Sequence, residues 1–244
     1  MRAGTFGDLL PCLRHASGWR AGSLAAAGLA TAAMLLLADA GAAFASPIKF
    51  SIETLQDGSC GAACPKVITA EGDIDDTAPE RYLEFLRSHI NDKQVRNVVF
   101  LHSPGGAVTS AIKLGQYVRL MGSAVVIGRR ERDGASEHFL PARCMSACVF
   151  VLMGGKKRVV PEYSLVGIHR MFREETGPDP SGERNRRREK LFASGNMVDA
   201  VSRYTSAMGI SKDLIKAAEK VSPDQIHIIT PDELARWRLG KGQF

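Results

Sequence analysis

Short apolar runs and helical stripes alternate along the first half of the chain. Residues 66–74 (KVITAEGDI) alternate apolar and polar side chains, which predicts a half-buried strand. Residues 77–90 carry an apolar stripe at helical spacing, and residues 95–103 (VRNVVFLHS) form a nearly continuous apolar run typical of a strand buried on both faces. A second helix is predicted over 107–120 and a third strand over 123–128. Strands and helices in this order predict an α/β domain with a mainly parallel sheet.

The second half of the chain is predicted to be largely helical. Residues 134–144 show no clear period and are predicted as a loop, after which residues 147–153 are apolar all round, as in a buried helix. Two short strands are predicted at 157–160 and 164–169. A charged insert at about 173–190 interrupts the core, and helical patterns resume from 191. Two capping boxes, Thr77 with Glu80 and Thr230 with Glu233, predict helix starts.

The N-terminal segment has the pattern of a secretory signal. Basic Arg14 and Arg20 precede an apolar run that ends near Leu37, and the small residues AFA end at Ala45. We therefore expect cleavage after Ala45, a single domain over 46–244, and a periplasmic or secreted protein. The alternative is an uncleaved anchor that faces the periplasm, and only then is the membrane a partner.

Charge argues against a nucleic-acid partner. The formal net charge is +6, and acids and bases are interspersed along the chain. One basic run, residues 184–190 (RNRRREK), stands out, and the pattern favours a solvated helix face. Contact with a polyanion or a lipid headgroup is the alternative interpretation.

Four of the five cysteines lie beyond the leader: Cys60, Cys64, Cys144 and Cys148. An even number of cysteines in an exported chain predicts disulfides, although the sequence leaves three connectivities open. Local pairing of Cys60 with Cys64 is possible in a Gly/Ala/Pro turn. Cys144 and Cys148 are one helical turn apart and can pair only if a helix begins between them. A metal site is the competing interpretation, but no histidine stands at ligand spacing, so none is predicted.

Three polar features stand at the ends of predicted elements. The first is SPGG, residues 103–106, where consecutive glycines after a buried strand leave backbone N–H groups open to a crevice. The second is Ser146, at the N-terminus of a buried helix whose dipole favours developing negative charge. The third is His169, which ends a strand and is able to act as a base. Separately, each has an ordinary explanation as a tight turn, a small helix residue or a strand-end histidine.

In this order the three features resemble the Clp protease proteolytic subunit, within the wider ClpP/crotonase fold. The matching pieces are LHSPGGAVTSAIKLGQYVR, CMSACVFVLMGGKKRVVPEYSLVGIH and, more loosely, TPDELARWRLG. The resemblance covers residues 67–169 and implies repeated β-β-α units with a helical C-terminal part. It further implies Ser146 as nucleophile, His169 as general base, and an oxyanion hole from the N–H of Ala147 with that of Gly105 or Gly106.

The chain departs from the resembled family at the acid that orients the histidine. Alanines stand where the aspartate would align, which leaves Asp224 or Glu219 as substitutes; Asp224 is the predicted third residue. A Ser/His dyad without an acid still reacts, but up to ~10⁴-fold more slowly. The insert at 173–190 replaces part of the helix that the resembled family uses to assemble into rings. A ring is therefore not predicted for this chain, and a homo-oligomer of another kind remains an open alternative.

The resemblance implies an exported serine hydrolase, most simply a peptidase, that needs no cofactor and no ATPase partner. Its substrate would be a peptide or protein; ester or thioester hydrolysis is a variant of the same chemistry. A non-catalytic binding or scaffold protein of the same fold is the alternative. A lysine-assisted serine peptidase is a further alternative, but Lys156 and Lys157 lie at the far end of the helix that Ser146 opens.

Overall fold

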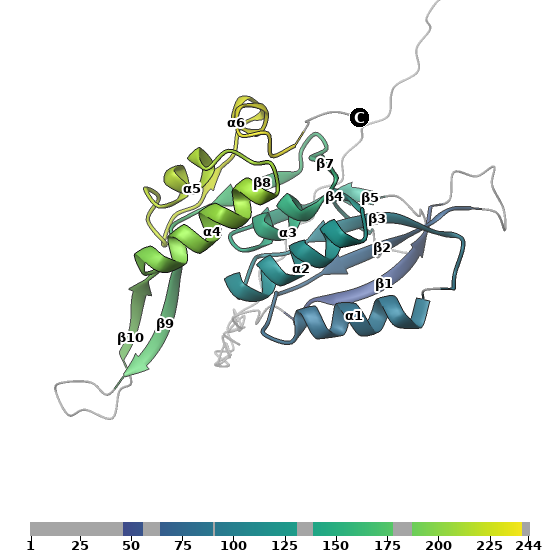
Figure 1. The fold of residues 1–244 in the computed structure, drawn as a ribbon, viewed down its shortest axis with the longest axis horizontal. Coiled ribbons are helices and arrows are strands. Elements are labelled where there is room, and N and C mark those ends of the chain that lie inside the picture. The colour runs from purple at the N-terminus through teal and green to yellow at the C-terminus, as the bar shows by residue number, and fades with distance from the viewer. Residues whose placement is uncertain (1–45, 56–63, 90, 131–138, 178–186, 241–244) are drawn as a thin grey trace, which may run out of the picture. The chain divides into compact units, whose positions relative to one another are not determined.

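A sheet with a parallel centre forms the core of the protein (Figure 1). The computed structural model describes residues 46–55, 64–89, 91–130, 139–177 and 187–240. The predicted leader, residues 1–45, and Cys60 lie outside the described residues. All described elements belong to one compact unit, Ala43–Phe244. In chain order these elements are β1 (Lys49–Thr54), β2 (Lys66–Glu71), α1 (Ala78–His89), β3 (Val95–His102), α2 (Val108–Leu120), β4 (Ala124–Arg130), β5 (Phe139–Pro141), β6 (Arg143–Met145), α3 (Cys148–Gly154), β7 (Lys157–Val159), β8 (Leu165–Ile168), β9 (Phe172–Gly177), β10 (Arg187–Phe192), α4 (Gly195–Ala207), α5 (Asp213–Ala218), β11 (His227–Ile228) and α6 (Pro231–Arg236).

The strand order of the main sheet is β1-β2-β3-β4-β5, with β7 also paired to β4. β2, β3, β4 and β7 run parallel, and the antiparallel strands β1 and β5 flank them. A second sheet, β11-β8-β6, continues from the first because Ser103, just after β3, bridges to Cys144 of β6. The predicted α/β fold with a mainly parallel core and a helical C-terminal part is confirmed.

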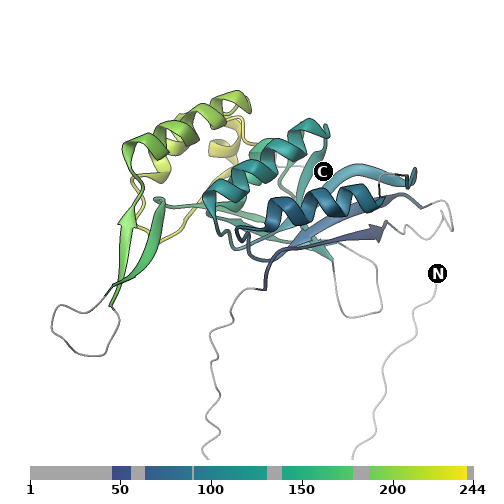
Figure 2. The same ribbon diagram turned by 60° about the horizontal axis from the view of Figure 1, so that its bottom comes forward.

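Helices α1 and α2 cover one face of the main sheet, and α4, α5 and α6 gather beside the second sheet (Figures 1 and 2). Helices α2 and α3 approach closely because glycines meet at their crossing. A Cβ atom on Gly154 would lie 2.1 Å from the carbonyl oxygen of Gly115, so no larger residue fits there. α3 is buried along its whole length, as its unbroken apolar sequence predicts.

Several predicted elements differ from the observed ones. β1 was not predicted, and residues expected as a loop before Ser146 contain the short strands β5 and β6. The predicted helix face at the basic run is wrong where the structure describes it, because residues 187–190 lie in β10, which pairs with β9. Where the structure describes it, the charged insert thus lies in the β9–β10 hairpin, which extends away from the main sheet (Figure 2).

Of the two predicted capping boxes, one forms. Thr230 and Glu233 cap α6 reciprocally, with Thr230 Oγ1 accepting from the N–H of Glu233 at 3.3 Å. At α1 the predicted pair finds other partners, because the Thr77 hydroxyl donates to Asp75 and Glu80 binds the ammonium group of Lys113. Among the described helices, none has both the length and the apolar character needed to span a bilayer.

Candidate active site

Ser146 lies on a sharp turn between β6 and α3. Its backbone has φ = 55°, a left-handed conformation that is strained for a residue with a side chain. Its N–H donates to the carbonyl oxygen of Gly167 at 2.8 Å, and its own carbonyl accepts from Val149, which begins the helical hydrogen bonding. The turn leaves the half-buried Ser146 side chain at the carboxyl end of β6. Such strained strand-to-helix turns are found around reactive nucleophiles.

His169 reaches the same place by strand pairing. β6 and β8 are parallel neighbours, with Met145 opposite Gly167, so both strands end at one edge of their sheet. Ser146 follows the end of β6, and His169 follows the end of β8. The structure therefore brings together the two residues that are 23 positions apart in the sequence, as the pairing of parallel strands requires.

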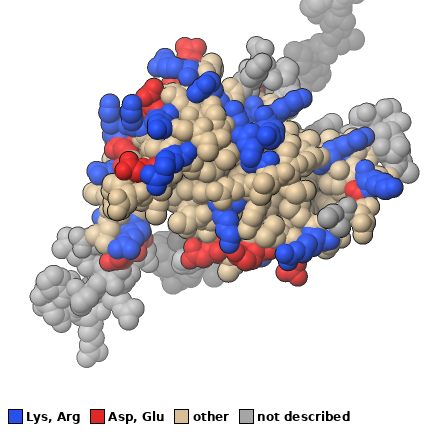
Figure 3. Space-filling view, viewed as in Figure 1, with Lys and Arg blue, Asp and Glu red and all other residues tan. Residues whose placement is uncertain are grey.

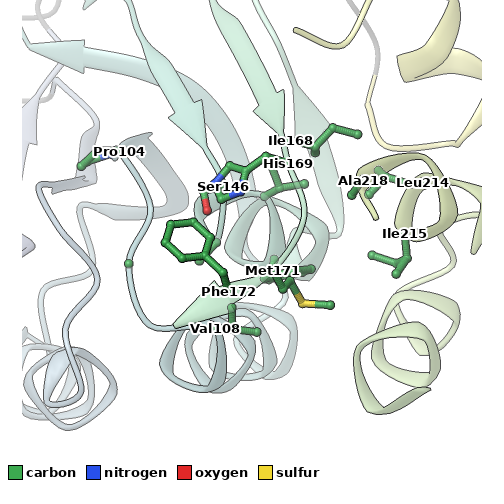
Figure 4. A pocket seen from close by; sticks show the side chains of 14 residues that line it. Pro104, Val108, Ser146, Ile168, His169, Met171, Phe172, Leu214, Ile215 and Ala218 are labelled. Carbon is green, nitrogen blue, oxygen red and sulfur yellow. The ribbon is translucent and has the colours of Figure 1, made fainter. Parts of the chain in front are cut away.

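Ser146 and His169 line one cavity of about 280 Å³. In Figure 4 the Ser146 oxygen lies beside the imidazole ring, and Leu214, Ile215 and Ala218 of α5 and its end form the opposite wall. The remaining apolar lining includes Val108, Val149, Phe150, Ile168, Met171 and Phe172. The cavity is therefore an apolar chamber with its polar groups gathered at the serine and the histidine.

The hydrogen bonding of the two polar side chains differs. Nδ1 of His169 donates to the carbonyl oxygen of Arg170 at 2.8 Å, because a carbonyl can only accept. This bond assigns the proton of a neutral imidazole to Nδ1 and leaves Nε2 as an acceptor. Within the described part of the chain, Ser146 Oγ makes no hydrogen bond, to His169 or to any other group. Nε2 is therefore the nitrogen available to take a proton from the serine.

Gly106 and Ala147 line this cavity, and their backbone N–H groups have no hydrogen-bond partner among the described residues. The N–H of Gly105, the other glycine considered for an oxyanion hole, is not available. It donates to the buried hydroxyl of Ser103 at 3.1 Å, and Gly105 does not line the cavity. The geometry thus favours Gly106 over Gly105 as the second donor beside Ala147.

Ser103 and His102 connect the end of β3 by hydrogen bonds to β6, the strand that precedes Ser146. The N–H of Ser103 donates to Arg143, and its carbonyl accepts from Met145 at 3.0 Å. His102 Nδ1 accepts from the N–H of Arg143 at 3.1 Å. Burial lowers the pKa of His102, an effect opposed by the carboxylate of Glu71. A neutral imidazole is the form that can accept this bond, so the environment of His102 supports the alignment of β6 with β3.

The predicted acid, Asp224, does not contact His169. Its carboxylate binds the ammonium group of Lys190, at an exposed position, and Asp224 does not line the cavity. The other candidate, Glu219, lies nearer, but its carboxylate contacts Arg170 and Met171 instead of the imidazole. No carboxylate among the described residues is hydrogen-bonded to His169.

A disulfide joins Cys144 to Cys148, with their Cα atoms 5.2 Å apart. The bond spans the Ser146 turn, and the pairing is possible because α3 begins only at Cys148. Both cysteines are fully buried. Cys64 is also disulfide-bonded. The bond closes a short loop with Ser146 at its centre, and so limits the conformations that the Ser146 backbone can adopt.

Replacing Cys144 and Cys148 together by alanine is expected to lower the free energy of unfolding by roughly 2 kcal/mol, the value for so short a loop. Because the strained turn loses its brace, the reaction of Ser146 with an active-site probe should also slow. Urea unfolding and labelling rates of the double variant measure the two effects. Unchanged stability together with unchanged labelling would contradict a bracing role.

A second cavity, of about 650 Å³, adjoins the first and shares Gly106, Val108, Met171 and Phe172 with it. It lies between the start of α2 and the β9–β10 hairpin, and its lining includes Leu191, Phe192 and Met197. The sequence pattern predicted a helix from residue 191 onward, so the strand position of Leu191 and Phe192 beside this cavity was missed. Leu191 and Phe192 are adjacent and follow an unbroken charged run, so no alternating strand pattern revealed it.

Comparisons with known proteins find distant structural likenesses and leave the chemistry to this chain's own residues. No family model matches the chain, and no curated protein matches it. One similar solved structure is a serine-to-alanine variant of the 1510-N membrane-bound stomatin-specific protease, at 12% identity and a TM-score of 0.49, covering 72% of this chain and 77% of that one. A lysine-to-alanine variant of the same protease, in complex with a substrate peptide, matches at 14% identity and a TM-score of 0.48, covering 72% and 73%. At these identities no residue of this chain is identified as catalytic.

Proposed function

We propose that this protein is a serine hydrolase, most simply a peptidase, that acts through an acyl-enzyme on Ser146. The observation that carries the proposal is that one apolar cavity is lined both by a strained serine and by an imidazole, with neither the serine hydroxyl nor Nε2 hydrogen-bonded among the described residues. The left-handed backbone of Ser146 costs free energy, and strain of this kind clusters at active sites. A convergence of this kind is what nucleophilic catalysis requires.

In the proposed reaction, Ser146 Oγ attacks the carbonyl carbon of the scissile bond while its proton passes to His169 Nε2. The oxyanion that forms accepts hydrogen bonds from the N–H groups of Gly106 and Ala147. His169 then gives the proton to the leaving amine as the C–N bond breaks, which leaves an acyl ester on Ser146. Water, deprotonated by His169, hydrolyses that ester and restores the free serine.

The apolar character of both adjoining cavities supports a peptide or protein substrate. The face in Figure 3 gives no support to a nucleic-acid substrate, because acidic side chains lie among the basic ones there as well as along the lower edge. Export to an oxidising compartment remains part of the proposal, and the buried disulfide that braces the Ser146 turn supports it.

A non-catalytic binding protein is the second candidate. Two observations favour it: the hydroxyl of Ser146 is not hydrogen-bonded to His169, and no described carboxylate contacts the imidazole. The same cavity would then hold a peptide without cleaving it. In resting enzymes, however, such a catalytic hydrogen bond is often long or absent and forms with substrate bound.

A peptide-hydrolysis assay separates the candidates. The purified protein and its Ser146→Ala variant are each incubated with a complex peptide mixture, and new amino termini are quantified by mass spectrometry. A peptidase produces termini that the variant does not. Peptides retained by both proteins without cleavage would support the binding protein, and hydrolysis of model esters without peptide cleavage would indicate an esterase.

Lys190 is the described lysine to test as an alternative base. Its ammonium group lies 4.8 Å from the centroid of the Phe172 ring, which lines the cavity, but it is bound to Asp224, and no lysine lines the cavity itself. We expect Lys190→Ala to keep peptidase activity within about threefold of the unaltered protein, since the exposed pair contributes little. Loss of activity comparable to that of Ser146→Ala would transfer the role of base from His169 to Lys190.

A further inference from the structure

The peptide group that joins Arg170 to Met171 is hydrogen-bonded at both ends. Its carbonyl oxygen accepts from Nδ1 of His169 at 2.8 Å. Its N–H donates to Oε1 of Glu219 at 3.4 Å. One planar peptide group therefore lies between a carboxylate and the imidazole of the candidate base.

Hydrogen bonds in such a chain polarise one another. A negative charge at the N–H end of a peptide group draws the N–H proton and increases the electron density on the carbonyl oxygen. The carbonyl then becomes a stronger acceptor for the imidazole N–H. Only 19% of the Glu219 side chain is exposed, so solvent screens this effect less than it would at the surface.

The carboxylate of Glu219 is held in place by the side chain of Arg170. Nε of Arg170 lies 3.4 Å from Oε2 of Glu219, as an ion-pair contact, since that buried nitrogen makes no hydrogen bond. The Arg170 guanidinium also lies over the ring of Phe192, 4.1 Å from its centroid. Glu219 can therefore direct Oε1 at the N–H of Met171 without rotating away.

A residue close to Glu219 in the chain also binds the backbone N–H of Arg170. The N–H of Arg170 donates to the carbonyl oxygen of Val221 at 3.0 Å. Residues 219–221, which follow α5, thus accept hydrogen bonds from two consecutive N–H groups of the segment that carries His169. Earlier residues of the same helix, Leu214 and Ile215, line the cavity.

We propose that Glu219 is a positioning residue that performs the task of the missing acid through the Arg170–Met171 peptide group. It favours the Nδ1–H tautomer of His169 and stabilises the imidazolium that forms during the reaction. Because the neutral carbonyl transmits only part of the charge, the support is weaker than that of a directly bonded carboxylate. The expected effect of Glu219 on the rate at Ser146 rests on the proposed function. Its expected effect on the tautomer of His169 rests on the geometry alone.

The kinetic test uses a fluorophosphonate, which reports the reactivity of Ser146 without a known substrate. Serine Oγ displaces fluoride from phosphorus, and the serine proton passes to the base. We expect Glu219→Ala to slow the maximal labelling rate by at least about tenfold while the half-saturating probe concentration stays the same. Glu219→Gln keeps an oxygen that accepts from Met171, and we expect it to recover part of that loss. Glu162→Ala, at an exposed turn residue, is the control and should label at the unaltered rate.

The tautomer is measured independently by ¹⁵N NMR of histidine-labelled protein at alkaline pH, with the signals assigned by His169→Gln. We expect Nδ1–H in the unaltered protein and a mixture of tautomers in Glu219→Ala. Equal labelling rates and an unchanged tautomer in a folded Glu219→Ala variant would overturn the inference. If the unaltered protein is not labelled at all, the proposed function fails, and the NMR signals still decide the role of Glu219.

Discussion

Replacing His169 by alanine is expected to slow the reaction of Ser146 with a fluorophosphonate by about 10⁴-fold or more. An unassisted serine hydroxyl keeps its proton and is a weak nucleophile near neutral pH. The imidazole is the described base that shares the cavity with Ser146, and the bond from Nδ1 to Arg170 directs Nε2 away from the backbone. Labelling rates of the two proteins, measured with the same probe, give the factor directly.

The control for this prediction is His89→Ala, at a histidine on α1 that does not line the cavity. It should label at the unaltered rate. Thermal unfolding of both variants separates a chemical effect from a loss of structure. A folded His169→Ala variant that reacts within tenfold of the unaltered protein would show that another group activates Ser146.

Replacing Gly105 by alanine is expected to have the largest effect on structure around the site. Gly105 has φ = 115°, a conformation that side chains disfavour. An added Cβ would lie 2.8 Å from both the carbonyl oxygen of Met145 and Cβ of Ser146, so the Ser146 turn must move. We expect a loss of about 3 kcal/mol in unfolding free energy from strain and overpacking. Labelling should slow by about 100-fold, the scale of a 1 Å displacement.

Gly209→Ala separates backbone strain from steric collision. Gly209 also has a positive φ, 78°, but nothing lies within 4 Å of where its Cβ would be. That variant should lose only about 1 kcal/mol and label normally. Unfolding free energies from urea titration and labelling rates test both glycines. If Gly105→Ala behaves like Gly209→Ala, the close approach of Gly105 to Ser146 does not shape the turn.

The approach of Ser146 to His169 could be predicted from sequence because it follows from strand order. An apolar strand ending in SPGG, a serine opening an apolar helix and a histidine ending the next strand all lie at carboxyl ends, which parallel pairing collects at one edge. The choice between Gly105 and Gly106 could not be made, since it depends on one hydrogen bond to the Ser103 side chain.

The features that sequence did not predict depend on long-range pairing. Residues 187–190 are charged and favour a helix locally, yet they form β10 because residues 172–177 supply a partner strand. Asp224, the predicted third residue, is paired with Lys190 of that hairpin instead. Glu219 approaches His169 through a peptide group and not by contact with the imidazole, an arrangement that leaves no signature in residue spacing.

The central claim, that Ser146 is an activated nucleophile, is tested most directly by mass spectrometry of the fluorophosphonate-treated protein. We predict one adduct per chain, located on Ser146 by peptide mapping, absent from Ser146→Ala and from heat-denatured protein, and greatly slowed in His169→Ala. A folded protein that forms no adduct, or that forms one elsewhere in the chain, would contradict the account and favour a binding protein that keeps the fold without the chemistry.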